Sequence, residues 1–309
     1  MFFVTCFVFA DTKIFMGKLF GYYENIPYLC TNKTSYRKMK KTILWMLAAI
    51  LICGSAVFTS CTNEDNPATP DLNLSEKIIG KWIVADINGQ PALTNRKIVF
   101  TFVSTTQAYM SASLNRFSEV GSHWIDQLET DVVINGNKMT LTNHPDEHTT
   151  VVMEYNITAI NNSEFSANRK LIITVDGNVA VSIEEAVRLV KVTADYAEPI
   201  LGLWECQGIT GGETNNDANA RLEFLADGTY RYYRKDEGGQ WQAVTTREFQ
   251  DYFVDGTLLA TRWKNQGQEI AYEWWEISTV SGGQMQWNAL RQNVDGSTFQ
   301  QSVKWTKVN

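Results

Sequence analysis

The sequence predicts an all-β protein built from two copies of one domain. Three observations predict this: Asn-Gly and Asp-Gly dipeptides recur along the chain, apolar and polar residues alternate beside them, and a residue pattern repeats at an offset of 120. These dipeptides favour the positive φ angles of tight β-hairpins, and a period of two is typical of half-buried strands. The sequence therefore indicates two antiparallel β domains behind an N-terminal segment of different character.

The N-terminal segment has the pattern of a targeting signal. Two lysines follow Met39, an uncharged and mostly apolar run occupies residues 42–59, and small side chains lead directly to Cys61. Positive charge, apolar run and small residues, in this order, form a secretory signal peptide. We therefore expect residues 39–60 to be the signal peptide and residues 1–38 to be a wrongly annotated upstream extension that is not part of the fold.

A cysteine at the cleavage point resembles the lipobox of bacterial lipoproteins, in which the thiol is acylated and becomes the new N-terminus. The resemblance implies that Cys61 attaches the protein to a membrane through a lipid. The alternative is a signal-anchor helix, because the 18 residues of 42–59 are just long enough to span a bilayer. Residues 61–74 form an acidic and polar tether, and residues 62–66 within it resemble the export signal of surface lipoproteins in Bacteroidetes; a solvated tether has almost the same pattern. The implied location is the outer membrane, on its periplasmic side or at the cell surface.

The chain beyond the signal is acidic and poor in cysteine. Residues 1–60 hold seven of the 27 basic and two of the 34 acidic residues, which leaves a net charge of −12 for the remainder. This balance argues against a nucleic-acid partner, since phosphate binding needs clustered Lys and Arg. Besides Cys61 only Cys206 remains, so no disulfide framework exists and the fold must be held by its core.

The repeat divides the remaining chain into residues 75–193 and 198–309. Residues 131–136 align with residues 251–256 at the offset of 120. Four more residues of the first copy match the second at the same offset: Tyr155, Ile157, Ile160 and Asn168 stand opposite Trp275, Ile277, Val280 and Asn288. An ordered series of matches indicates two homologous domains, joined near Pro199.

Each copy has the pattern of antiparallel strands separated by tight turns. The turn dipeptides stand at 88–89, 135–136, 176–177, 227–228, 255–256 and 295–296. Residues 182–189 carry the one helical signal, because Ser182 and Glu185 have the spacing of a capping box. The second copy has a strand-like run there, so a short helix is expected in the first copy alone. Roughly 110 residues per copy suffice for a compact barrel or sandwich with its own core.

Three motifs resemble the lipocalin-like domains of Bacteroidetes lipoproteins. They are a Gly-x-Trp at the start of each copy, a Phe-x-x-Asp-Gly-Thr-Tyr hairpin that ends at Tyr230, and a closing Lys-Trp-Thr-Lys-Val strand at 304–308. The first copy lacks the Asp-Gly-Thr-Tyr turn. The resemblance implies two tandem up-and-down β-barrels, each with an open mouth for a small molecule, and it implies that Trp82 and Trp204 are structural residues at the closed ends.

No motif indicates catalysis, a resident metal or a cofactor. The string His-Pro-Asp-Glu-His at 144–148 has the order of inverted zinc peptidases. That chemistry needs a helix, whereas this string contains a proline and lies between the strand-like runs 138–141 and 151–155. It therefore predicts a hairpin loop, with adventitious metal binding as the alternative. We expect a protein that is not an enzyme.

Tryptophan is concentrated in the second copy, which holds seven of the ten in the chain. The repeat places Trp275 on the buried face of its strand, so Trp274 is expected on the exposed outer face. The same alternation directs Trp263 inward, where it lines a cavity together with Tyr230 and Tyr232. The alternative is that large rings simply fill a small core.

These observations leave three classes of function open. We favour a binder of a small apolar or amphipathic molecule inside a barrel. The second class is a surface binder of glycan or protein that uses exposed aromatic residues such as Trp274. The third is a structural envelope lipoprotein without a ligand. The fold alone does not separate these classes.

Overall fold

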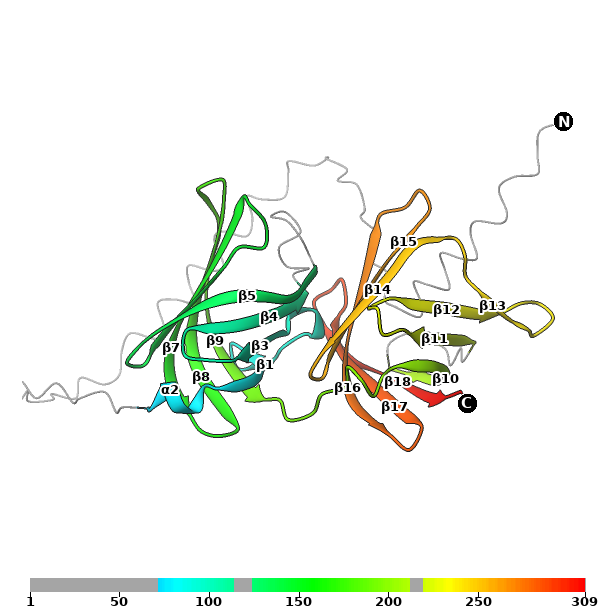
Figure 1. The fold of residues 1–309 in the computed structure, drawn as a ribbon, viewed down its shortest axis with the longest axis horizontal. Helices are drawn as coiled ribbons and strands as arrows, with labels where there is room; N and C mark the ends of the chain where they lie inside the picture. The colour runs from blue at the N-terminus through cyan, green and yellow to red at the C-terminus, as the bar shows by residue number, and fades with distance from the viewer. Residues whose placement is uncertain (1–71, 114–123, 212–218, 309) are drawn as a thin grey trace, which may run out of the picture. The chain divides into compact units, whose positions relative to one another are not determined.

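The computed structural model describes residues 72–113, 124–211 and 219–308. The predicted lipidation site Cys61, the signal peptide and the upstream extension lie outside these residues. All described residues fall in one compact unit and form an almost entirely β structure (Figure 1). Within them the α-helix α2 (Leu74–Lys77) has four residues and η1 (Thr94–Arg96) is a single 3-10 turn. No helix in this part of the chain has the length and apolar character needed to cross a membrane.

The first sheet closes into a barrel. Its strands are β1 (Gly80–Ile87), β2 (Gln90–Pro91), β3 (Ile98–Phe102), β4 (Gln107–Ser113), β5 (Trp124–Asn135), β6 (Lys138–Asn143), β7 (Thr149–Ile160), β8 (Glu164–Val175) and β9 (Asn178–Lys191). From β3 onward each strand pairs with the next one along the chain, and β1 pairs with both β3 and β9. The β1–β9 pairing closes the ring, and β2 is appended to β1 outside it.

The second sheet curls into a barrel with a seam. Its strands are β10 (Gly202–Thr210), β11 (Ala220–Phe224), β12 (Tyr230–Lys235), β13 (Trp241–Ala243), β14 (Arg247–Asp255), β15 (Leu258–Asn265), β16 (Ile270–Ser281), β17 (Gln284–Gln292) and β18 (Thr298–Lys307). They pair in the order β13-β12-β11-β10-β18-β17-β16-β15-β14. The seam lies between β12 and β14, where Thr229 and Asp251 form an isolated bridge. It remains open because β13 folds back on β12 and occupies its edge.

The prediction of an all-β fold with two tandem antiparallel barrels is therefore confirmed, with the second barrel closed less completely than the first. Four of the six predicted turn dipeptides stand in connections between strands, and at 135–136 and 255–256 the first residue ends the strand and the glycine begins the turn. At 88–89 and 176–177 both residues of the turn have positive φ, between 47° and 78°. This is the backbone conformation that a two-residue hairpin requires.

The two barrels repeat one another in detail. In each, the tryptophan of the Gly-x-Trp motif donates its indole N–H to a carbonyl four residues earlier at 2.6 Å, and a lysine of the last strand lies over its ring. These groups are Trp82, Ile78 and Lys191 in the first barrel and Trp204, Ile200 and Lys307 in the second. Both tryptophans are fully buried, as expected of structural residues. The first and last strands of each barrel also shift register at equivalent points, between Val84 and Asp86 and between Cys206 and Gly208.

The predicted helix at 182–189 is wrong, because these residues belong to strand β9. Glu185 does not cap a helix; it pairs across the sheet with Arg169 at 2.6 Å inside the barrel, where both side chains are buried. Val187 and Leu189 alternate inward beside it and join the core. The interstrand ion pair and the burial of alternate residues outweigh the local capping pattern.

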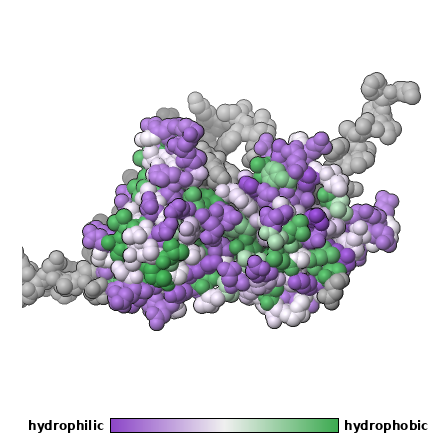
Figure 2. Space-filling view, viewed as in Figure 1, coloured by the Kyte–Doolittle hydropathy of each residue, from purple (hydrophilic) through white to green (hydrophobic). Residues whose placement is uncertain are grey.

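Three groups of buried apolar residues form the core. One fills the first barrel, one fills the second, and a third lies where the outer faces of the barrels meet. On the face shown in Figure 2, hydrophilic residues cover the ends of the long hairpins. The apolar side chains are therefore concentrated inside the barrels and at their junction.

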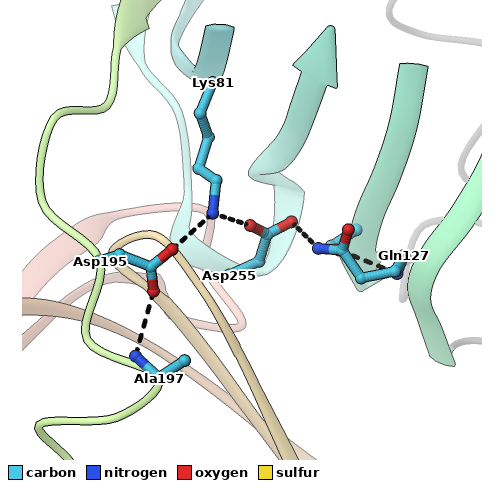
Figure 3. Close-up of polar contacts among 6 residues, drawn as sticks. Lys81, Gln127, Asp195, Ala197 and Asp255 are labelled. Carbon is cyan, nitrogen blue, oxygen red and sulfur yellow. Dashed lines mark hydrogen bonds and ion pairs between the residues drawn. The ribbon is translucent and has the colours of Figure 1, made fainter. Parts of the chain in front are cut away.

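A chain of polar contacts borders this junction (Figure 3). Lys81 of the first barrel lies 2.7 Å from a carboxylate oxygen of Asp255 in the second and 2.8 Å from Asp195 in the connecting segment. Gln127 donates to the other oxygen of Asp255 at 2.7 Å. The buried Asp255 carboxylate thus receives a charge and a hydrogen bond from the first barrel.

Candidate binding site in the second barrel

The interior of the second barrel has an aromatic floor. Trp275, Trp287 and Trp305 come from the neighbouring strands β16, β17 and β18 and are fully buried. Their ring centroids are separated by 5.8 Å between the first two and by 4.7 Å between the last two. Phe224 adds an edge-on contact to Trp287 at 6.0 Å. Offset and tilted contacts of this kind are favourable for aromatic rings, so the floor is a packed and rigid surface.

The three inward residues proposed from the sequence come together above this floor. Tyr230, Tyr232 and Trp263 are all buried, and they surround the guanidinium of Arg247 at centroid distances of 5.9, 4.8 and 5.0 Å. Arg247 also donates hydrogen bonds to the Tyr230 hydroxyl at 3.1 Å and to the side-chain oxygen of Gln250 at 2.8 Å. The site is an aromatic cage that holds a cation belonging to the protein itself.

Arg247 is a site residue that the sequence analysis missed. It lies at the first position of β14, and the strand shifts register between Arg247 and Phe249. Counting alternate residues back from the inward Tyr252 therefore places position 247 on the wrong face. A charged residue that opens a strand beside a barrel seam is a weak signal, and only the three-dimensional structure shows where its guanidinium lies.

Burial shifts the pKa values of Tyr230 and Arg247 in the cage. It raises the pKa of Tyr230 to about 12, although the nearby Arg247 acts in the opposite direction, so this phenol stays protonated at neutral pH. Burial also lowers the pKa of Arg247. The guanidinium has exchanged hydration for three ring faces and two oxygen acceptors, which are the contacts that stabilise it in this interior.

A second polar cluster lies beside the cage. Arg291 of β17 donates to the buried carboxylate of Glu273 on β16 at 2.6 Å and to Gln301 of β18 at 2.7 Å. Its guanidinium also lies 4.5 Å from the centre of the Trp275 ring. Burial raises the pKa of Glu273 to about 7, against the opposing effect of Arg291. Glu273, whose pKa lies near neutrality, thus contacts Arg291, whose guanidinium lies over the Trp275 ring of the aromatic floor.

Trp274 does not occupy the exposed position predicted for it. Its side chain does point away from the interior that holds Trp275, as strand alternation requires, but only 7% of its surface is accessible. Leu258 and Ala260 pack beside it, and Ile83 and Val99 of the first barrel belong to the same cluster. The prediction of exposure is wrong because the other barrel covers this outer face. Trp274 is therefore not a surface platform for a ligand.

The histidine string forms the loop between β6 and β7, as its proline and its flanking strands predicted. His148 pairs through Nδ1 with Asp176 at 2.8 Å, and His144 contacts the hydroxyl of Thr150 at 3.2 Å. In the described ranges no three His, Cys, Asp or Glu side chains are grouped so that they could hold a metal ion. The loop has the contacts of a hairpin end.

The first barrel carries a polar groove of about 600 Å³ on its outer face. The groove crosses β6, β7, β8 and β9, and two rows of outward side chains border it: Lys138, Asn156, Asn168 and Ala186 in one row, and Thr140, Glu154, Lys170 and Glu184 in the other. Its two lysines and two exposed glutamates balance in charge. This surface suits a hydrophilic ligand rather than an apolar one.

No protein-family model matches the chain, and no curated protein matches its sequence. Among solved structures, a protein of unknown function from the DUF3598 family of Nostoc punctiforme has 12% identity and a TM-score of 0.23, over 77% of this chain and 99% of that one. A mutant of the vaccine antigen transferrin binding protein B from Haemophilus parasuis has 9% identity and a TM-score of 0.20, over 71% of this chain and 61% of that one. At such scores neither fold nor function is carried over to this chain.

Proposed function

We propose that this chain is a non-catalytic binding protein that holds a small amphipathic molecule inside its second barrel. The observation that carries the proposal is the convergence of Tyr230, Tyr232 and Trp263 on a buried guanidinium. Aromatic surface with a few placed polar groups is the usual lining of a small-molecule site. The resemblance to lipocalin-like domains adds a barrel interior as the place for the ligand, and the lipobox adds an anchor at Cys61 in the outer membrane.

The distribution of polarity supports an amphipathic rather than a purely apolar ligand. Along β17 the inward residues run from Trp287 through Ala289 to Arg291, so the interior changes from aromatic to charged within five residues. A wholly apolar molecule would bring apolar atoms against Arg291 and Arg247 and exclude water from these charged groups. A molecule with an apolar body and a polar end satisfies both levels at once.

Native mass spectrometry of the mature chain, isolated from the organism's own envelope, tests the proposal. We expect a bound mass that disappears on denaturation and is absent from the Trp263→Ala variant. Trp241→Ala is the matched control, because Trp241 lies outside the interior, beneath the side chains of Arg221 and Lys235. A bare protein, or a mass lost equally from both variants, would contradict binding inside the second barrel.

A second candidate is a surface binder of hydrophilic molecules, favoured by the outer groove of the first barrel. Two of its three asparagine side chains, Asn156 and Asn168, form no side-chain hydrogen bond within the described part of the chain. Asn288, the repeat equivalent of Asn168, bonds to Ser302 at 2.6 Å. Loss of glycan binding in an Asn156→Ala, Asn168→Ala double variant, with the barrel-bound mass retained, would assign function to this groove.

A further inference from the structure

We infer that the ligand of the second barrel carries an anionic acceptor group, such as a carboxylate or a phosphate, which it presents to hydrogen-bond donors in the interior. This inference rests on the proposed function and adds the chemical class of the ligand's polar end. The polar groups of the interior are mainly donors: the indole N–H groups of the floor and the guanidinium groups above it, which are already bonded to oxygen atoms of the protein.

The indole groups of the floor are donors without acceptors. The Nε1 atoms of Trp275, Trp287 and Trp305 are buried and have no hydrogen-bond partner among the described residues. The structural Trp204 in the same barrel differs, because its Nε1 donates to the Ile200 carbonyl at 2.6 Å. Buried tryptophan N–H groups normally find a partner, so three unsatisfied donors in one cluster call for an acceptor that the described residues do not supply.

The first barrel shows that the fold does not require these donors. At the positions equivalent to the three tryptophans it has Tyr155, Ala167 and Leu189, all of them buried in its core. Two of these residues carry no side-chain donor, and the first barrel still closes completely. The tryptophans of the second barrel are therefore a local departure from a shared architecture. At these positions the first barrel fills its core with smaller residues.

The charged side chains above the floor favour a ligand group of negative charge. Arg247 and Arg291 are both directed at aromatic rings of this interior, and Glu273 is the buried carboxylate that contacts Arg291. The cage of Tyr230, Tyr232 and Trp263, which would attract a cationic group, already holds a guanidinium. An anion complements guanidinium and indole donors together, and bonds of this kind between charged groups are the strong ones.

Calorimetric titration of the mature chain with four twelve-carbon amphiphiles below their micelle concentrations tests the inference. The probes are dodecanoate, dodecyl phosphate, dodecanol and dodecyltrimethylammonium. We expect at least one anion to bind about tenfold or more tightly than dodecanol, and the ammonium compound to bind more weakly than either anion. The stronger of the two anions identifies carboxylate or phosphate as the preferred group.

Trp287→Phe tests the donors separately from the ring, because it removes the N–H and keeps an aromatic side chain. We expect it to lower the affinity for the anion while leaving that for dodecanol within about twofold. Trp241→Phe is the matched control outside the interior. If Trp287→Phe does not fold, Trp305→Phe removes a neighbouring donor in the same way.

Equal affinity for anions and dodecanol would overturn the anionic class and leave binding in the barrel intact. Preference for the ammonium compound would overturn it as well. If none of the four probes binds, the inference fails, and the mass measured on the envelope-derived protein decides separately whether the proposed function also fails.

Discussion

Glu273 gives the second barrel a titratable group near neutral pH. Burial raises its pKa from an ordinary 4.5 to about 7, so between these values the folded protein holds a proton that the unfolded chain has lost. The contribution of this group to the free energy of unfolding is therefore greatest below pH 4.5 and is lost as the pH rises through about 7. A shift of this size corresponds to roughly 3 kcal/mol.

We expect the melting temperature to fall between pH 5.5 and pH 8, and the Glu273→Gln variant to lose most of this dependence. Glutamine retains an oxygen acceptor for Arg291 but does not titrate. The variant therefore removes the effect of protonation on stability and keeps the hydrogen bond to Arg291. Thermal unfolding followed by circular dichroism at several pH values measures the difference. An equal pH dependence in both proteins would show that Glu273 does not titrate in this range.

Single residues also show how far the sequence determines the site. The inward directions of Tyr230, Tyr232 and Trp263 follow from alternation, because each lies in a regular strand. Trp274 has the outward direction that alternation gives but is buried by another domain, which alternation along one strand cannot reveal. Arg247 was missed because a register shift reverses the alternation that leads to it.

At the level of elements, β8 and β9 are joined by a buried ion pair in a segment whose local sequence favours a helix. Arg169 and Glu185 stand directly opposite one another, and each side chain is only 3% exposed. Glu185→Leu would leave a buried guanidinium without its carboxylate. We expect this variant to lose about 3–5 kcal/mol in the free energy of unfolding.

The Arg169→Met, Glu185→Leu double variant should regain most of that loss, because an apolar pair of similar size has no charge to desolvate. Denaturant unfolding of the single and double variants measures the difference. A double variant as unstable as the single one would mean that packing around Glu185, rather than its charge, holds the strand. Far-ultraviolet circular dichroism of the double variant would also reveal any return of this segment to helix.

The elements that the sequence predicts well are those whose signal is local. The hairpin turns at 88–89 and 176–177 are specified by dipeptides that accept positive φ, and the structure has them. The strand at 182–189 and the seam beside β14 are not local properties. The first depends on a partner strand and the second on a hairpin that competes for an edge, so neither appears in the pattern of a single segment.

For the molecule as a whole, the duplicated fold makes different use of equivalent surfaces. The outer face of β15 and β16 carries Leu258, Ala260 and Trp274, and it packs against the first barrel. At the equivalent positions on β6 and β7 the first barrel has Lys138, Thr140 and Glu154, which border its polar groove. One copy of this face is apolar and covered, and the other is polar.

The complementary face shows the reverse difference. Ile83 and Val99, paired across β1 and β3, join the buried cluster from the first barrel. Their equivalents on β10 and β11, Glu205 and Arg221, form an ion pair at the surface of the second. A head-to-tail contact between repeats can continue into a filament, and we expect the polar residues on both unused faces to oppose this.

Replacing the apolar residues on the outer face of β15 and β16 by their equivalents from β6 and β7 should therefore separate the barrels without unfolding them. The variant is Leu258→Lys, Ala260→Thr, Trp274→Glu, and all three side chains point away from the second barrel's interior. We expect one calorimetric melting transition for the unmodified protein and two for this variant, because the contact that couples the barrels would be lost. Any mass bound in the second barrel should remain, since Tyr230 and Trp263 are untouched.

The reciprocal exchange, Lys138→Leu, Thr140→Ala, Glu154→Trp, is the matched control on the free face. It leaves the contact between barrels intact and exposes an apolar patch, so we expect a single transition and self-association that increases with concentration. Analytical ultracentrifugation measures the association. One unchanged transition in the first variant would show that the polar contacts of Lys81 and Asp255 join the barrels without the apolar face. If the second variant stays monomeric, its polar residues are not what limits assembly to two domains.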